Sequence, residues 1–361
     1  MIIAHITDSM QIGGAETIIA QLCRIQRLQG HCPRVHCLYE IGPVGQRLQN
    51  EGVEVTLQRP PTLVGLMRSL YRTFRRSKPD VVHCHNATAA IIGAVPARLV
   101  GVRTVLVTRH GLVGPPYSLR RELKFAVASR FCNWVVAVCD IARDNLRKAP
   151  FSARDRIVRI YNGCVAARAD GSTTPPKIGF TLLNVGRLSV AKDQESLIRA
   201  FALAKNYVTD LQLWIVGDGP LKSRLKELTQ ELGVEKATQF FGEQTDVAPF
   251  YVAADLFIMS SVSEGLPVSL LEAMSASLPS IVTDVGGMGE VARLSGSTLI
   301  VPASSYKTLA NAIREVAQNR FELAYLRGAV RQCYEEHFTL VMMADEYLRL
   351  YQTSSDRPAR C

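Results

Sequence analysis

Residues 180–216 read FTLLNVGRLSVAKDQESLIRAFALAKNYVTDLQLWIV, and this stretch indicates the fold. Its first six and last six residues are mostly apolar, which is typical of strands that are buried on both faces. A polar loop and a helix-length amphipathic segment separate these two runs. A strand, a helix and a second strand in this order predict a βαβ unit, whose strands lie parallel in one sheet.

The same alternation runs along most of the chain. Further strands are predicted on both sides of this unit, at residues 2–6, 34–38, 53–57, 80–84, 104–108 and 134–138, and at 237–241, 255–259, 279–283 and 297–301. The segment AARADGSTTPPK between the two series has the composition of a linker. The sequence therefore predicts an α/β protein with two doubly wound, Rossmann-like domains that face a cleft.

A length of 361 residues also suits two domains. We place the first domain at residues 1–165, the linker at 166–178 and the second domain at 179–338. Residues 339–361 contain a helical pattern that no further strand follows. We expect this helix to cross back to the first domain and to end in a frayed tail.

Charge is distributed unevenly along the chain. Residues 1–170 hold 24 Lys and Arg against 11 Asp and Glu, a balance of +13, whereas residues 171–361 hold 18 against 21, a balance of −3; the sum is the total of +10. This asymmetry predicts an anionic partner for the first half, either a phosphorylated substrate or a membrane surface. Nucleic acid is disfavoured, because no aromatic platform is interleaved with the basic residues.

The nine cysteines form no C-x-x-C pair and no cluster with the spacing of a zinc site, which predicts reduced thiols in a cytoplasm. The first residues, MIIAHITDSM, do not have the pattern of a secretory leader. No run reaches the ~18 apolar residues that a membrane span needs. We expect a cytoplasmic protein that is soluble or peripheral on the cytoplasmic face of the inner membrane.

Ligands of open parallel sheets bind beyond the carboxyl ends of the strands, so candidate residues are sought there. In DSMQIGGAE, Gly13 and Gly14 lie between a strand and a helix, where backbone can approach a diphosphate at a helix N-terminus. A tight turn without a ligand explains the same pair equally well.

Polar side chains end two more strands of the first half. HCHN places His83, His85 and Asn86 at one strand end, and TRHG places Arg109 and His110 at the next. Together they favour a sugar-like or phosphate-like ligand. A hydrogen-bonded histidine pair is the simpler alternative, and a metal pair is disfavoured because no third ligand stands at a recognisable spacing.

The second half offers a cationic loop. Arg187 and Lys192 follow the strand at 180–185, where two cations can neutralise a diphosphate leaving group. Taken singly, each is more simply a solvated surface cation. In VGDGPL, Gly217 and Gly219 form a glycine-rich strand end against which a flat base can lie.

The stretch SEGLPVSLLEAM holds two glutamates around a turn and a helix start. Leu266, Pro267 and Val268 begin the helix, and the free backbone N–H groups after Gly265 are expected to point at an anion. Glu272 lies inside the helix, and a carboxylate accepts hydrogen bonds from a diol such as the ribose of a nucleotide. Glu264 precedes the turn. Capping or solvation of the helix is the alternative for both glutamates.

These motifs, in the order GGAE, HCHN, TRHG, VGRLSVAKD, VGDGPL, SEGLPVSLLEAM and GGMGE, resemble those of retaining glycosyltransferases of family 4, which have the GT-B fold. The resemblance covers essentially the whole chain. It implies a UDP-sugar donor held mainly by the second domain, without a metal. Arg187 and Lys192 then match the diphosphate contacts, Glu272 the ribose contact, and Glu264 the residue near the transferred sugar.

In the first domain the resemblance implies acceptor binding. Gly13 and Gly14 match the loop that closes over the diphosphate, and His110 matches the histidine that contacts the sugar. Two positions depart from the family pattern: Cys139 stands where serine is common, and Asp193 stands where glycine is frequent. Both departures concern loop geometry.

Two basic segments of the first domain, 63–78 and 117–131, have two interpretations. Each is either a core-packing helix with a solvated basic side or a docking surface for anionic lipid. The sequence as a whole predicts transfer of a sugar, with retention, to a glycan or lipid-linked acceptor in polysaccharide or lipopolysaccharide biosynthesis. A nucleotide-sugar epimerase and a catalytically silent binding subunit are the alternatives.

Overall fold

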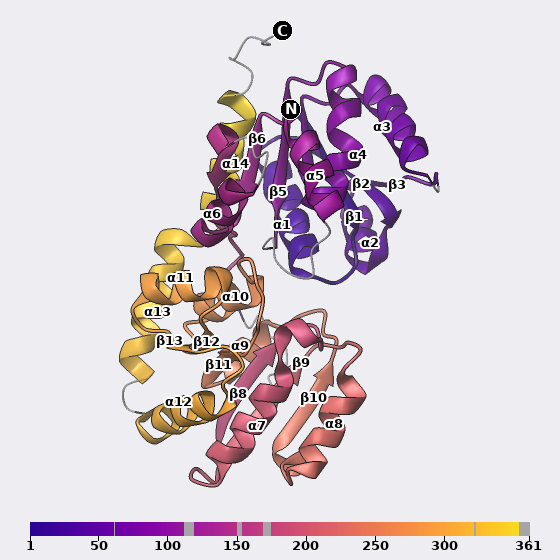
Figure 1. The fold of residues 1–361 in the computed structure, drawn as a ribbon. Helices are drawn as coiled ribbons and strands as arrows, with labels where there is room; N and C mark the ends of the chain where they lie inside the picture. The colour runs from indigo at the N-terminus through magenta and orange to yellow at the C-terminus, as the bar shows by residue number, and fades with distance from the viewer. Residues whose placement is uncertain (61, 112–118, 150–153, 169–174, 321–322, 354–361) are drawn as a thin grey trace. The chain divides into compact units, whose positions relative to one another are not determined.

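The computed structural model describes residues 1–60, 62–111, 119–149, 154–168, 175–320 and 323–353. The chain divides into two compact units, one formed by residues 1–163 and 340–361 and the other by residues 164–339 (Figure 1). The expected tail at 354–361 and part of the expected linker at 166–178 lie outside the described residues.

Within the described residues, the first unit has a parallel sheet of seven strands in the order β3-β2-β1-β4-β5-β6-β7. The strands are β1 (Ile2–Ser9), β2 (Cys32–Glu40), β3 (Glu54–Leu57), β4 (Val81–His85), β5 (Thr104–Arg109), β6 (Trp134–Ala137) and β7 (Ile157–Arg159). The helices are α1 (Gly14–Leu28), α2 (Gly42–Asn50), α3 (Leu63–Ser77), α4 (Asn86–Leu99), α5 (Leu119–Ser129), α6 (Asp140–Lys148) and α14 (Leu340–Thr353), with a short 3-10 helix, η1 (Arg154–Arg156).

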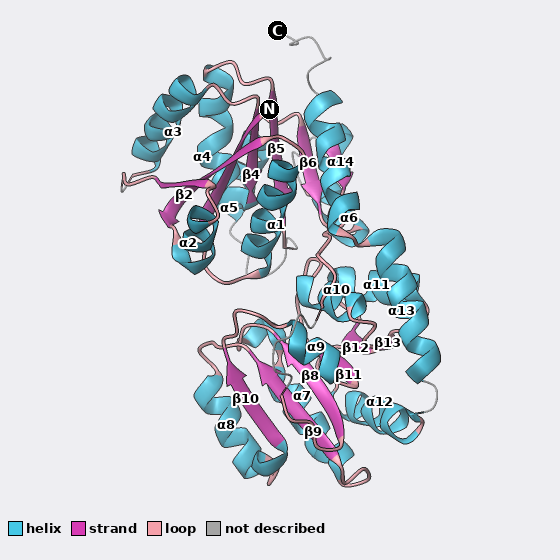
Figure 2. Ribbon diagram, turned by 180° about the vertical axis from the view of Figure 1, so that it is seen from behind, coloured by secondary structure: helices cyan, strands magenta, loops and turns pink. Residues whose placement is uncertain are grey.

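The second unit repeats this plan with six described strands in the order β10-β9-β8-β11-β12-β13. Figure 2 shows the strands of each unit as one sheet with helices around it. The strands are β8 (Phe180–Val185), β9 (Leu211–Val216), β10 (Thr238–Gly242), β11 (Leu256–Met259), β12 (Ser280–Thr283) and β13 (Leu299–Val301). The helices are α7 (Gln194–Lys205), α8 (Lys222–Glu231), α9 (Ala248–Ala253), α10 (Val268–Ser275), α11 (Gly286–Ser295), α12 (Tyr306–Gln318) and α13 (Leu323–His337), with η2 (Val190–Lys192) and η3 (Glu235–Ala237).

The predicted fold class is confirmed, since both units are parallel α/β sheets and every predicted strand overlaps an observed one. Strand β7 was not predicted, because three residues between arginines carry no visible periodicity. In each sheet the strand order reverses beside the first strand, between β1 and β4 and between β8 and β11. Ligands of such sheets bind at the carboxyl ends of these strands.

The final helix α14 belongs to the first unit (Figure 1). Its buried Tyr347 and Tyr351 point their hydroxyls at the first sheet: Tyr347 contacts Thr108 at 2.9 Å, and Tyr351 contacts His83 at 2.9 Å. The Thr104 hydroxyl also donates to the Tyr351 carbonyl. The chain therefore returns from the second unit to complete the core of the first.

The two departures from the family pattern both act as helix caps. The Cys139 sulfur accepts from the backbone N–H of Ala142 at the start of α6. Asp193 adopts a left-handed backbone, with φ of 47°, and its carboxylate accepts from Ser196 at the start of α7. Aspartate tolerates this conformation and caps well, so it serves where glycine alone would leave the helix uncapped.

Eight cysteines in the described part of the chain are free thiols, and of these only Cys32 is exposed. Burial raises the pKa of Cys23 and of Cys132 to about 12, so both stay protonated. Among the described helices, none has both the length and the apolar character that crossing a membrane requires.

Candidate functional site

An ion pair joins the segments that follow the adjacent strands β8 and β11. Lys192, at the end of η2, pairs its ammonium with the carboxylate of Glu264, and the two side chains are only 21% and 13% exposed. The Ser260 hydroxyl donates to the carbonyls of Lys192 and Asp193, at 3.0 and 2.8 Å. Thus Lys192, predicted to contact the diphosphate, and Glu264, predicted to lie near the sugar, are neighbours at the switch point of the second sheet.

Arg187 stands on the same loop but remains exposed, without an ion-pair partner among the described residues. Its carbonyl accepts from the buried Gln194 side chain at 3.0 Å. The backbone is therefore fixed while the guanidinium stays available. Such a cation suits a ligand that arrives with negative charge.

The predicted glycines of VGDGPL pack against this loop. A Cβ on Gly217, whose φ is +132°, would lie 2.1 Å from the carbonyl oxygen of Gly186, and a Cβ on Gly219 would lie 2.3 Å from that of Leu188. Only glycine permits this approach. Both glycines thus brace the loop that carries Arg187, in addition to any surface they offer to a base.

The turn before α10 is held by the start of α11. Gly286 has φ of +52°, and a Cβ on it would meet the Glu264 carbonyl oxygen at 1.9 Å. The N–H of Gly287 donates to the Gly265 carbonyl at 2.6 Å. The GGMGE motif therefore sets the position of Glu264 through the backbone.

Helix α10 begins at Val268 after Pro267, with no side-chain cap. The side chains of Leu266, Pro267 and Val268, predicted to bind the donor, are buried, so a ligand at this helix start would meet backbone rather than these side chains. An α-helix start of this kind carries a partial positive charge. Anion binding at this helix start stays a prediction.

Glu272 lies one turn into α10 and accepts a hydrogen bond from the Tyr251 hydroxyl at 3.0 Å. Burial raises the pKa of the Glu272 carboxyl, and the tyrosine bond lowers it in part. Burial and the neighbouring carboxylate likewise raise the pKa of Tyr251 well above its usual value. The second carboxylate oxygen has no partner among the described residues, so Glu272 can accept from a diol.

In the first unit, Gly13 ends the β1–α1 connection and Gly14 begins α1. Gly13 is the N-cap of α1, in extended backbone that any residue adopts, and no side chain caps the helix. The Glu16 carboxylate lies beside Gly13, and burial raises the pKa of this carboxyl. The helix start and its glycines agree with an anion site, although the backbone does not demand glycine at 13.

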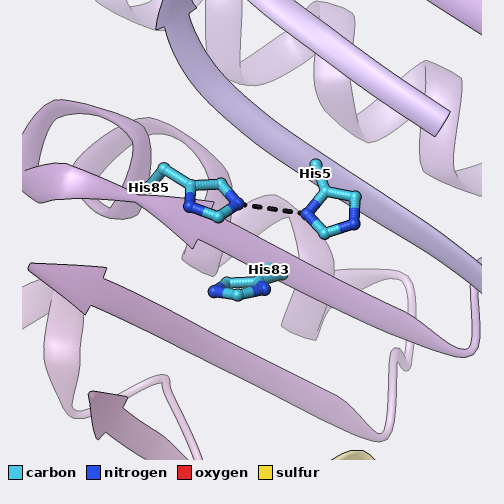
Figure 3. Close-up of side chains that lie close together, drawn as sticks. All are labelled: His5, His83 and His85. Atoms are coloured by element: carbon cyan, nitrogen blue, oxygen red, sulfur yellow. Dashed lines mark hydrogen bonds between the residues drawn. The ribbon is translucent and has the colours of Figure 1, made fainter. Parts of the chain in front are cut away.

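Four histidines meet at the switch point of the first sheet. His5 Nδ1 lies 3.0 Å from His85 Nε2, and His85 Nδ1 lies 3.0 Å from His110 Nε2. His5 Nε2 contacts the Gln26 side-chain oxygen at 2.9 Å. Figure 3 shows His5, from β1, beside His83 and His85, from β4. Burial lowers the pKa of His5 and of His110 to about 4, so both rings are neutral at physiological pH.

Two of the predicted contacts have structural partners instead. His83 is fully buried, and its nitrogens contact Tyr351 and Thr108, so neither is left for an acceptor or sugar. Arg109 pairs with Glu122 at 3.3 Å and lies over the ring of Phe125, so it packs α5 against the sheet. Strand-end position alone suggested both as ligand contacts, and their buried partners were not visible in the sequence.

Asn86, predicted as an acceptor or sugar contact, is hydrogen-bonded to the backbone of His110. It has a left-handed backbone, with φ of 69°, and its side-chain oxygen accepts from the backbone N–H of His110 at 3.1 Å. Asparagine is among the few residues that tolerate this conformation. Asn86 therefore positions His110 at the end of β5.

His5, Gln26 and Tyr251 were not among the residues predicted from the sequence. A histidine inside the apolar run IIAHI was the one available signal for His5. With it, three histidines, His5, His83 and His85, have ligand atoms within 4.8 Å of one another. Their nitrogens are already engaged in the hydrogen bonds described above, which favours a polar network over a metal centre.

Comparison with known proteins identifies both halves of the chain. The model of Glycosyltransferase Family 4 matches residues 12–168, and that of Glycosyl transferases group 1 matches residues 169–332. Over 318 residues the chain is 26% identical to the UDP-Gal:alpha-D-GlcNAc-diphosphoundecaprenol alpha-1,3-galactosyltransferase of Escherichia coli, covering 82% of each chain.

Two further similarities agree. The lipopolysaccharide core biosynthesis glycosyltransferase LpsD of Rhizobium meliloti is 31% identical over 185 residues, 51% of this chain and 52% of LpsD. Anabaena Alr3699/HepE, solved in complex with UDP-glucose, superposes with a TM-score of 0.86 at 19% identity, over 99% of this chain and 100% of that one.

Two Rossmann-like units with these matched halves define a glycosyltransferase of GT-B fold. The chain belongs to the family 4, group 1 glycosyltransferases, as its motifs predicted.

Proposed function

We propose that this enzyme transfers a sugar from UDP to a lipid-linked or glycan acceptor, with retention at the anomeric carbon, during assembly of a surface polysaccharide or lipopolysaccharide. The observation that carries the proposal is the Lys192–Glu264 pair at the switch point of the second sheet. The similar proteins support the substrates: the E. coli relative is named for UDP-Gal and a diphosphoundecaprenol-linked sugar, and LpsD for the lipopolysaccharide core.

The diphosphate of the donor is assigned to Arg187, Lys192 and the start of α10. Arg187 contributes an exposed guanidinium, whereas Lys192 is engaged with Glu264. A diphosphate competes for the Lys192 ammonium and weakens that pair, which frees Glu264 to accept from a sugar hydroxyl. Fixed cations and helix dipoles stabilise the negative charge that develops on the departing UDP.

The ribose is assigned to the free oxygen of Glu272, while Tyr251 holds the other oxygen in place. Gly217 and Gly219 set the loop of Arg187 and leave the strand end open to the uracil base. In the first unit, Gly13 and Gly14 are assigned to the diphosphate and His110 to the transferred sugar. Asn86 and His85 support His110 through its backbone and its ring.

Retention is proposed to proceed by front-side attack, in which the leaving phosphate helps to remove the proton of the acceptor hydroxyl. Exclusion of water limits hydrolysis of the donor. Anomeric stereochemistry of the first-formed product, read by proton NMR, tests this part. An inverted product would overturn it.

A membrane surface is proposed as a partner of the first unit. In α3 the apolar face is already used, because Leu66, Leu70 and Phe74 are buried in the core. By contrast α5 and the turn after it expose Leu123, Val127 and Phe131, a row at helical spacing. Arg120 and Lys124 are exposed on α5 itself, and α3 carries Arg68, Arg72, Arg75 and Arg76. Exposed apolar side chains among cations suit an anionic lipid surface.

Sedimentation with vesicles tests the membrane partner. Binding to vesicles that contain anionic lipid, lost in Leu123→Glu with Val127→Glu, supports it; Leu28→Glu, at a residue 88% exposed on α1, is the matched control. Equal sedimentation of both variants would overturn the role of α5.

A thermal-shift panel with UDP, GDP, ADP and dTDP, each with and without EDTA, tests the donor site. A ligand at ~100 times its dissociation constant adds roughly 2.7 kcal/mol to the folded state. We expect a shift with UDP that survives EDTA and that Lys192→Ala diminishes. A shift with another nucleotide, or none, would overturn the UDP assignment.

Incubation of UDP-sugars alone and with an undecaprenyl-diphosphate-linked sugar then tests transfer. A product formed only with the acceptor supports the proposed reaction. Conversion of the donor sugar in the absence of acceptor would instead indicate epimerase activity.

A further inference from the structure

Four side chains of the first unit, Gln26, His5, His85 and His110, form one unbranched chain of hydrogen bonds that ends at His110. We call this chain the histidine file. The Gln26 oxygen contacts His5 Nε2 at 2.9 Å, His5 Nδ1 contacts His85 Nε2 at 3.0 Å, and His85 Nδ1 contacts His110 Nε2 at 3.0 Å. They come from α1, β1, the end of β4 and the residue after β5. Their order in space does not follow their order in the sequence.

A file of neutral imidazoles has a direction. Each neutral ring has one N–H and one lone pair, so a ring that donates at one nitrogen accepts at the other. The Gln26 oxygen only accepts, so His5 donates from Nε2 and accepts at Nδ1. It follows that His85 donates from Nε2, and that His110 donates from Nε2 as well. The file therefore leaves a lone pair at His110 Nδ1.

The amide of Gln26 also contacts the C-terminal helix. Its nitrogen lies 3.5 Å from the Tyr351 hydroxyl, which also contacts His83 Nδ1 at 2.9 Å. A tyrosine hydroxyl that accepts from the amide uses its one proton to donate to His83. His83 Nε2 then carries a proton and donates to Thr108, at 2.8 Å. With the Gln26 oxygen facing His5, all of these bonds are satisfied together.

The open end of the file is sheltered. His110 Nδ1 has no contact with water and no hydrogen-bond partner among the described residues. The backbone of His110 is held by Asn86, and its other nitrogen by His85. A buried polar atom without a partner is costly in a folded protein. This nitrogen is therefore suited to a ligand that donates a hydrogen bond.

We propose that Gln26, His5 and His85 are positioning residues that fix the tautomer of His110, so that its Nδ1 accepts a hydrogen bond from a hydroxyl of the transferred sugar. This inference rests on the proposed function. It adds a rule of specificity: a hydroxyl can donate to this nitrogen, whereas a carboxylate at the same place presents a second lone pair and is repelled.

Nitrogen-15 NMR of histidine-labelled full-length protein reads the tautomers directly, because long-range proton couplings distinguish Nδ1–H from Nε2–H. We expect His5, His85 and His110 all to carry the proton on Nε2. Gln26→Leu removes the terminal acceptor and should mix the tautomers of His110, whereas Gln26→Glu keeps an acceptor and should restore one. His36, a buried histidine that contacts Thr56 instead, is the internal reference.

Ligand addition tests the open end. UDP-glucose should shift the Nδ1 resonance of His110, and UDP alone should not. In turnover, Gln26→Leu should lower kcat about tenfold and Gln26→Glu should recover most of it, with UDP affinity unchanged in both. UDP-glucuronate should bind more weakly than UDP-glucose, with the difference reduced in Gln26→Leu.

A proton on Nδ1 of His110 in the wild type, or an unchanged tautomer in Gln26→Leu, would overturn the inference. Should Gln26→Leu fail to fold, Tyr351→Phe, which removes the hydroxyl that contacts the amide nitrogen, gives a second comparison. Failure of the proposed function has a different signature: the wild-type tautomers are as expected, but no UDP-sugar shifts any resonance. Tautomers as expected with a bound UDP-glucose that leaves Nδ1 unmoved would overturn the sugar contact alone.

Discussion

Acidification should unfold the first unit well before the second. Burial lowers the pKa of His5, His36 and His110 to about 4, against about 6.5 in an unfolded chain. Between these values only the unfolded state takes up the protons, so stability is present above pH 6.5 and is lost as the pH falls toward 4. At pH 5 each histidine lowers the free energy of unfolding by about 2 kcal/mol, and the three together by about 6 kcal/mol.

That loss is comparable with the whole stability of a typical domain, about 5–15 kcal/mol. His83 and His85, whose pKa values burial lowers well below the usual value, add to it in the same direction. The second unit is spared, because its single histidine, His337, is exposed. The same drop in pH should therefore separate the two units.

The two tryptophans allow each unit to be followed alone. Trp134 lies on β6 of the first unit and Trp214 on β9 of the second, so Trp214→Phe and Trp134→Phe each leave one reporter. Urea unfolding at pH 7.5 and pH 5 should show a large fall in midpoint for Trp134 and a small one for Trp214. His36→Gln should recover about 2 kcal/mol at pH 5. Equal pH dependence of both reporters would refute this account of the buried histidines.

Two pairs of substitutions in the second unit follow from its geometry. Gly217→Ala should lower the free energy of unfolding by roughly 2–6 kcal/mol, since it combines backbone strain with a clash against Gly186. The control Gly233→Ala, with φ of +65° but open space around it, should cost only about 1–2 kcal/mol. Equal losses of the two variants in urea unfolding would contradict the close packing at Gly217. Glu272→Gln should lower UDP affinity about tenfold, as measured by calorimetry, whereas Tyr251→Phe should change it little. Because burial raises the Glu272 pKa, the wild type loses stability as the pH rises through that value; the glutamine variant should therefore be the more stable at pH 8, with an advantage that shrinks toward pH 5. An unchanged affinity would remove Glu272 from the ribose role.

The fold could be predicted because its signal is local and repeated. FTLLNV and LQLWIV coincide with β8 and β9, since an apolar run between polar loops has few other places in a parallel sheet. Lys192 and Glu264 could also be chosen as candidates from the sequence, because each lies on the segment that follows a strand. Their direct pairing could not be predicted, since 72 residues separate them and nothing in either motif refers to the other.

In the first unit, the partners of the strand-end residues could not be predicted from the sequence. Strand ends indicated His83 and Arg109 as ligand contacts, but burial and partners from α14 and α5 assign them to packing. Conversely, Gln26 looked like an ordinary residue on the side of a helix. Its importance depends on its contact with His5, and its other polar atom contacts a tyrosine 325 residues further along the chain.

The histidine file also bears on why a protein keeps buried polar groups that weaken it in acid. An apolar core of equal volume would not lose the ~4 kcal/mol that His5 and His110 together cost at pH 5, and burial of polar groups is rarely the most stable solution. What a satisfied network provides is a single arrangement, because each bond restricts the next. In the file from Gln26 to His110, that arrangement determines whether the last nitrogen donates or accepts. A lone histidine at the end of β5 would be free to present either face, so the cost in stability corresponds to a defined chemistry at one atom.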